Sequence, residues 1–209
     1  MNPGVTHRGA TDGPDIGGNV VAGRLTAEQL DRLAQIAERA VVAAVRERRE
    51  LHPDPADFAA PLREAAAVFV TLRRHGQLRG CIGMLEPIMP AVEAVADRAR
   101  AAALHDPRFE PVRIDELDDL DVSVSVLSRP IPLAVHSYDE LRNRLRPGID
   151  GVVVDVGRHR ATFLPSVWEE LPDVDDFLLA LWRKAGLPHR AWPPGIIISC
   201  YTAQHAPAS

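Results

Sequence analysis

Hydrophobic positions along the chain follow two different periods. From Leu30 to residues 46–50, apolar residues recur at intervals of three and four positions, which predicts a helix with one buried face. This helix is preceded by Thr26 and Gln29 at the spacing of a capping box, in which each side chain accepts a backbone N–H. Residues 121–128 instead alternate between valine and polar residues, which predicts a half-buried strand.

Similar patterns predict helices and strands over the rest of the chain. Pairs of apolar runs separated by turn residues indicate two hairpins, and no internal repeat or regular βαβ alternation is visible. Further helices are expected over 91–104, 137–145 and 175–185, and further strands over 66–72, 78–84, 152–156, 161–164 and 196–201. Hairpins mixed with helices favour an α+β fold, with a largely antiparallel sheet and flanking helices.

Composition limits the domain organisation and the class of protein. Residues 1–24 are rich in glycine and poor in large apolar groups, which predicts a flexible tail before a folded domain over 25–205. The formal net charge of −5 argues against a nucleic-acid-binding partner. No apolar run has the length of a membrane span, and no secretory signal is visible. We therefore expect a cytoplasmic protein without a membrane partner.

Several well-known chemical signatures do not occur in the sequence. We find no Cys-x-x-Cys, no His-Glu-x-x-His, no phosphate-binding Gly-x4-Gly-Lys-Ser/Thr, and no Gly-x-Gly-x-x-Gly. Two cysteines without a tight spacing do not form a disulfide framework. The sequence therefore predicts neither a metal site nor a bound cofactor.

The most informative stretch is residues 78–83, Leu-Arg-Gly-Cys-Ile-Gly. Glycine weakens a strand interior, so two glycines here require a local reason such as close approach of another group. In an extended strand Arg79, Cys81 and Gly83 share one face, where the glycine would leave open space beside the thiol. A guanidinium beside the thiol would favour the thiolate. The alternative is that Cys81 is simply a small residue that fits between Gly80 and Gly83.

Two other segments carry candidate chemistry. Asp106 and Arg108, with Phe109, could place a carboxylate, a guanidinium and a ring at one rim, where arginine would suit an anionic ligand. The alternative is a turn that ends a helix, with Asp106 bonding nearby amides and Arg108 in solvent. Cys200 shares a strand face with Ile196 and Ile198, so we expect it to pack in the core.

These motifs resemble those of the AMMECR family, called protein A of the AmmeMemoRadiSam system in prokaryotes. Phe-Val-Thr-Leu at 69–72 followed by residues 78–83 is similar to the family signature. The matches continue, in the family's order, with residues 106–112, 124–128, 148–151, 163–165, 177–178 and 184–188 together with Trp192, so the resemblance covers roughly 26–204.

The resemblance implies a fold and a site, but it brings no reaction with it. It implies two unequal, intertwined lobes that form one unit, with the cysteine motif lining the cleft between them. The residue patterns and the resemblance together make Cys81 a candidate catalytic residue and the following candidate ligand-binding residues: Arg79, Gly80, Gly83, Asp106, Arg108 and Ser125. Ser123 stands where family members often have glutamate, so a carboxylate base is not available there.

Two functional hypotheses follow from the sequence. The first is an enzyme that acts on a small anionic or carbonyl substrate through Cys81. The second is an adaptor or peptide-binding module that uses the same cleft without catalysis. The name of the system implies a Memo-like protein and a radical S-adenosylmethionine enzyme as partners. The residues alone do not choose between an enzyme and a binding module.

Overall fold

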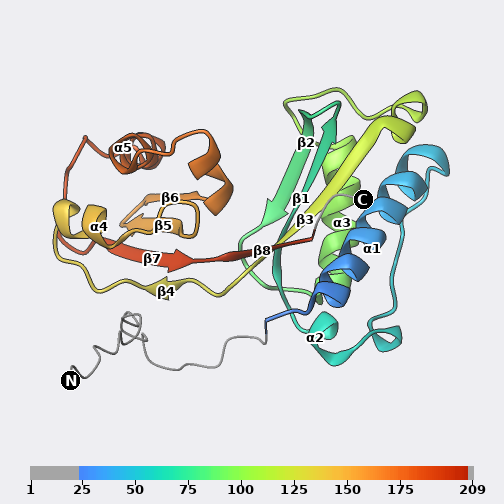
Figure 1. Ribbon diagram of the computed structural model, residues 1–209, viewed down its shortest axis with the longest axis horizontal. Coiled ribbons are helices and arrows are strands. Elements are labelled where there is room, and N and C mark those ends of the chain that lie inside the picture. Colours follow the sequence, from blue (N-terminus) through green and yellow to red (C-terminus); the bar gives the residue numbers. More distant parts are fainter. Residues whose placement is uncertain (1–23, 207–209) are drawn as a thin grey trace, which may run out of the picture.

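The computed structural model describes residues 24–206, which form two lobes, each built on a four-stranded antiparallel sheet (Figure 1). The predicted α+β class, with antiparallel sheets and flanking helices, is confirmed. The tail predicted over residues 1–24 lies, except for Arg24, outside the described residues. Among residues 24–206, no helix combines the length and the apolar composition needed to cross a membrane.

The first lobe is formed by residues 24–127 and by the last strand of the chain. Its sheet has the strand order β2-β1-β3-β8, and helices α1 and α3 cover one face of it (Figure 1). The elements of this lobe are α1 (Ala27–Arg46), the 3-10 turn η1 (Pro55–Asp57), α2 (Ala60–Arg63), β1 (Ala67–Arg74), β2 (Gln77–Met84), α3 (Ala91–Leu104), the 3-10 turn η2 (Ile114–Asp119), β3 (Leu120–Leu127) and β8 (Ala203–Ala206).

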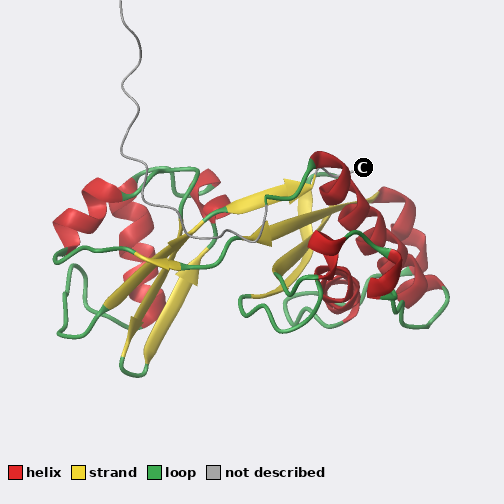
Figure 2. Cartoon of the chain, turned by 90° about the horizontal axis from the view of Figure 1, so that it is seen from below, coloured by secondary structure: helices red, strands yellow, loops and turns green. Residues whose placement is uncertain are grey.

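The second lobe has the strand order β4-β7-β5-β6, and its core packs this sheet against α4 and α5. In Figure 2 the two lobes lie side by side, and the helices of the first lobe are on the side of its sheet that faces away from the second lobe. The elements of the second lobe are β4 (Ile131–Pro132), α4 (Tyr138–Arg144), β5 (Gly151–Val156), β6 (His159–Phe163), the 3-10 turn η3 (Pro165–Glu169), α5 (Val174–Ala185) and β7 (Ile197–Tyr201).

Local sequence signals explain most of these elements. The capping box of α1 is present: Gln29 N donates to Thr26 Oγ1 at 3.2 Å, and Thr26 N donates to Gln29 Oε1 at 2.9 Å. The alternation in β3 is also confirmed, because Val122 and Val124 are buried under the helices. The sequence did not predict β8, the short strand that brings the C-terminal segment into the first sheet.

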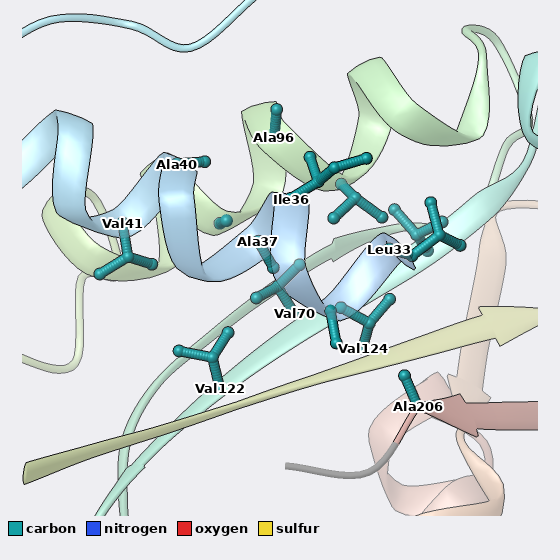
Figure 3. Packing of buried hydrophobic residues seen from close by; sticks show 14 of the residues in the cluster. Leu33, Ile36, Ala37, Ala40, Val41, Val70, Ala96, Val122, Val124 and Ala206 are labelled. Carbon is teal, nitrogen blue, oxygen red and sulfur yellow. The ribbon is translucent and has the colours of Figure 1, made fainter. Parts of the chain in front are cut away.

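Short side chains allow α1 and α3 to pack closely over the first sheet. Figure 3 shows Ala37 and Ala40 of α1 near Ala96 of α3, all of them buried. Val70 of β1 and Val124 of β3 lie beneath the helices and are fully buried as well. Burying a valine side chain contributes roughly 1.5 kcal/mol or more, so this layer is the main source of stability in the first lobe.

One two-stranded ribbon belongs to both sheets. Strand β3 pairs with β8 in the first sheet, and β4, which follows β3, pairs with β7 in the second. Between these pairs Ser128 N donates to the carbonyl of Thr202 at 2.9 Å, and Thr202 N donates to Ser128 Oγ at 3.0 Å. Both connections between the lobes therefore cross together, hydrogen-bonded to each other.

A small apolar cluster fills the space where the lobes meet. Its buried members come from both sheets, and Phe69 and Leu85 pack against it from the first lobe. The buried members are Ala67, Leu127, Val153 and Tyr201. Tyr201 also shares a 2.8 Å hydrogen bond with Thr162, so the joint is polar as well as apolar.

The close approach of α3 explains Gly80, because a Cβ there would lie 2.3 Å from the backbone oxygen of Ala102. We predict that Gly80→Ala lowers the free energy of unfolding by about 1–3 kcal/mol, since the helix must move to admit a methyl group. Urea denaturation measures this change. Cys81→Ala, one residue further along β2, is the control and should leave stability nearly unchanged. Equal effects of the two substitutions would contradict this account.

Candidate functional site

The candidate site lies on the face of the first sheet that α1 and α3 do not cover. The strand register places Thr71 of β1 between Cys81 of β2 and Ser123 of β3. Thr71 Oγ1 donates to Cys81 Sγ at 3.3 Å, and Ser123 Oγ donates to the Thr71 carbonyl at 3.4 Å. All three side chains are half-buried. We call this row, together with Ser125, the open face.

Cys81 also lies on an edge strand, whose outer N–H and C=O groups have no neighbouring strand. Asp106 accepts the Cys81 N–H at 2.8 Å, and Arg108 Nη2 donates to the Cys81 carbonyl at 3.2 Å. Residues 106–111, which we call the strap, thus take the place of a strand at this position. Covering an exposed edge in this way prevents it from pairing with another chain.

Within the strap, Asp106 and Arg108 form a two-pronged ion pair. Arg108 Nε and Nη2 donate to the two carboxylate oxygens at 2.9 and 2.7 Å. The Asp106 side chain is only 1% exposed, and these bonds, with those from the Cys81 and Arg108 amides, hold the pKa of its carboxyl well below its usual range. Asp106 is therefore a buried anion that fixes the position of Arg108.

Arg79 has a different role from the one predicted. Its Nε and Nη2 donate to the Glu116 carboxylate, both at 2.9 Å, and its Nη1 donates to the Glu110 carbonyl at 2.8 Å. The prediction that Arg79 stands beside the thiol as its cation is wrong, because these partners hold its guanidinium. The hydrogen bond from Arg79 is the main reason why the pKa of Glu116 falls to about 2.

Arg108 is the guanidinium that lies near the thiol. Its side chain is 54% exposed, in contrast to Asp106 beneath it. The pKa of Arg108 is raised chiefly by its hydrogen bond with Asp106, and interaction with the Cys81 thiol raises it further. The guanidinium that contacts Cys81 thus comes from the strap, 27 residues along the chain.

The remaining predicted residues, Gly80, Gly83 and Ser125, contact other parts of the protein. Gly80 faces α3, as described above. A Cβ at Gly83 would lie 2.2 Å from the Phe69 ring, so this ring fills the space that was predicted to be open beside the thiol. Ser125 lies on the open face, where it pairs in register with Phe69 of β1 rather than with Thr71. Its Oγ is 3.0 Å from Nδ1 of His205 on β8.

The structure therefore brings Cys81, Asp106 and Arg108 together and turns Arg79 towards Glu116. Sequence reasoning missed Thr71, Glu116 and His205 as neighbours of this site. Only register across β1 and β2 identifies Thr71, and nothing in the local sequence marks Glu116 as a partner of Arg79.

The second cysteine behaves as predicted. Cys200 packs against the core of the second lobe, and burial raises the pKa of its thiol to about 12. Within the described part of the chain, no group of three His, Cys, Asp or Glu side chains is placed to hold a metal ion. That no metal is bound stays a prediction.

The fold and site define a class of two-lobed α+β proteins in which a cysteine-bearing edge strand is covered by an Asp-Pro-Arg strap. The AMMECR1 family model matches residues 34–206, and the chain belongs to this family.

Three proteins illustrate the degree of similarity. A protein of Methanothermobacter thermautotrophicus is 43% identical over 157 residues, which cover 75% of this chain and 81% of that protein. Protein TK0174 of Thermococcus kodakarensis is 38% identical over 192 residues, covering 87% and 91% of the two chains. The crystal structure of the uncharacterized protein PH0010 from Pyrococcus horikoshii superposes with a TM-score of 0.77 at 36% identity, covering 85% of this chain and 90% of that one.

The pairing of Arg79 with Glu116 predicts a pH-dependent stability. Because the pKa of Glu116 drops from 4.5 to about 2 on folding, its contribution is complete above pH 4.5 and is lost as the pH falls towards 2. Arg79→Met should cost about 1.5–3 kcal/mol at pH 7, where it leaves a buried carboxylate without this partner. Denaturation at a series of pH values should show the difference from wild type shrinking below pH 4.5.

Arg113→Met provides the matched control for this experiment. Arg113 pairs with Asp115 near the strap, but both side chains are mostly exposed. Its loss should change stability little at any pH. A difference between Arg79→Met and wild type that stays constant down to pH 2 would show that Glu116 does not carry the effect.

The two cysteines should differ in reactivity. With a pKa of about 12, Cys200 at pH 8 has on the order of one thiolate in 10⁴ molecules. We predict that iodoacetamide labels Cys81 first, as followed by peptide mass spectrometry, and that Arg108→Ala slows this labelling. Labelling of Cys200 before Cys81 would contradict the assignment, and so would a Cys81 that reacts only after unfolding.

Proposed function

We propose that the protein binds a small anionic ligand on the open face, beside Cys81 and Arg108. The observation that carries this proposal is the way in which the strap holds Arg108. Asp106 engages Nε and Nη2, so Nη1 projects on the side of the guanidinium away from that carboxylate. A half-exposed guanidinium with a fixed orientation can bind a carboxylate or a phosphate without losing much side-chain freedom.

The other groups of the open face suit recognition of a polar ligand. The hydroxyls of Thr71 and Ser123 can each donate and accept hydrogen bonds. The Cys81 thiol lies between Thr71 and the strap, so a ligand held by Arg108 would contact it. Small side chains in this row leave access to the sheet, which large apolar residues would close.

Catalysis by the Cys81 thiol is a second candidate, and the interaction of Arg108 with that thiol supports it. Binding is favoured because the hydrogen-bond partner of Cys81 is the Thr71 hydroxyl, which is not a base at neutral pH. His205, which could act as a base, contacts Ser125 instead. The partnership with a Memo-like protein and a radical S-adenosylmethionine enzyme rests on the family resemblance and stays a proposal.

Protection of Cys81 from alkylation tests the proposal. We expect that phosphate, succinate or citrate, added at constant ionic strength, slows iodoacetamide labelling of Cys81 in a saturable way. Arg108→Ala should weaken this protection about tenfold, because it removes a charge-assisted hydrogen bond. Arg113→Ala, which removes an exposed charge near the strap, should leave protection unchanged.

The outcomes separate the alternatives. Binding of an anion elsewhere would give no protection, and non-specific charge effects would make Arg108→Ala and Arg113→Ala alike; either result would overturn the proposal. A covalent adduct on Cys81, seen by intact mass after incubation with a carbonyl compound and absent in Cys81→Ala, would favour the catalytic candidate over simple binding.

A further inference from the structure

A pocket of about 300 Å³ lies between the two lobes, away from Cys81 and Arg108. The first lobe contributes Leu85 and Glu86, which follow β2 directly. The second lobe contributes Ala161 and Thr162, with the charged side chains of Arg160 and Lys184. The pocket therefore has one acidic wall from the first lobe and two cations from the second.

Lys184 is the only lysine in a chain in which arginine provides every other cationic side chain. Its Nζ donates to the Thr162 carbonyl at 3.1 Å and lies 5.1 Å from the centre of the Phe163 ring. These two contacts hold the ammonium at the pocket wall. An ammonium has three donors, so the bond to Thr162 leaves two N–H groups for a ligand.

Arg160 is held less tightly than the arginines of the strap. Its guanidinium lies 3.7 Å from Glu86 and 3.7 Å from Asp155, beyond hydrogen-bond distance in both cases. Glu86 is mostly exposed, so its carboxylate can leave the pocket at little cost. An oxyanion with two oxygens would offer Arg160 the bidentate geometry that neither carboxylate provides.

The edge of β6 adds a backbone group to the pocket. Because the Thr162 carbonyl accepts from Lys184, it faces away from the neighbouring strand β5. The N–H of the same strand residue faces the same edge. The wall of the pocket thus presents the Thr162 N–H beside the two cations.

We propose that this pocket binds a phosphate or carboxylate group through Arg160 and Lys184, with Glu86 as the group that the anion displaces. The site is independent of the proposed function at Cys81, because it shares no residue with the open face or the strap. Its ligand class is set by two convergent cations and a backbone donor. Phosphate and carboxylate share this chemistry, and the experiment separates them.

The single lysine makes the site directly observable. Incorporation of lysine carrying ¹³C at the ε position labels only Lys184 and leaves its three N–H donors in place, so the chain gives one labelled lysine resonance. We expect inorganic phosphate or succinate, titrated against chloride at constant ionic strength, to shift the Lys184 resonance in a saturable way. The tighter of the two anions identifies the preferred group, and calorimetry on the unlabelled chain gives the same order.

Three variants test whether the anion binds at this pocket. Lys184 is not substituted, because its hydrogen bond to Thr162 also connects α5 with β6. Arg160→Ala should weaken binding about tenfold, and Glu86→Gln should tighten it, because the competing carboxylate is gone. Arg158→Ala is the matched control, since it removes the same charge from the exposed turn before β6.

The shift should persist in Arg108→Ala, which separates this site from the one at Cys81. Three results would overturn the proposal: no saturable shift with either anion, equal weakening by Arg158→Ala and Arg160→Ala, or weaker binding in Glu86→Gln.

Discussion

The ribbon formed by β3–β4 and β7–β8 is the constraint on which the rest of the structure depends. Its two strands leave one sheet and enter the other together, joined by the hydrogen bonds of Ser128 and Thr202. Neither lobe can complete its sheet without this crossing, because β8 belongs to the first sheet and β7 to the second. One ribbon therefore links the two sheets, and the C-terminal segment completes a sheet begun by the N-terminal half.

The position of the open face follows from the same crossing. Helices α1 and α3 take one face of the first sheet, and the ribbon brings the second lobe to the side of the other face. The apolar cluster around Tyr201 covers that face only near the joint. Further along β1, β2 and β3, the half-buried thiol and hydroxyl side chains of Cys81, Thr71 and Ser123 replace the apolar ones.

The contacts between the strap and the cysteine motif have a structural role and support the proposed functional one. An edge strand needs its outer backbone groups satisfied, and Asp106 and Arg108 do this at Cys81. The same contacts hold a guanidinium beside the thiol. Arg79 and Glu116 anchor the strap through its carbonyl at Glu110. Much of the motif therefore supports the fold, and the proposed ligand site uses the two groups that remain, Cys81 and Arg108.

Local patterns in the sequence were sufficient for most elements of the fold. The capping box at Thr26 predicted the start of α1, and the valine alternation predicted β3 with its buried face. These signals depend on groups within a few residues of each other, so no tertiary information is needed to interpret them. The α+β class followed from the order of such elements.

For the candidate site, the sequence by itself identified the side chains with candidate chemistry, among them Arg79, Cys81, Asp106 and Arg108. Tertiary structure alone decided that Arg79 pairs with Glu116, 37 residues away, and that Arg108 takes the place beside the thiol. It also decided that Phe69 fills the space at Gly83. The physical reason is that strand register and edge pairing set these contacts, and both are fixed only when distant segments pack together.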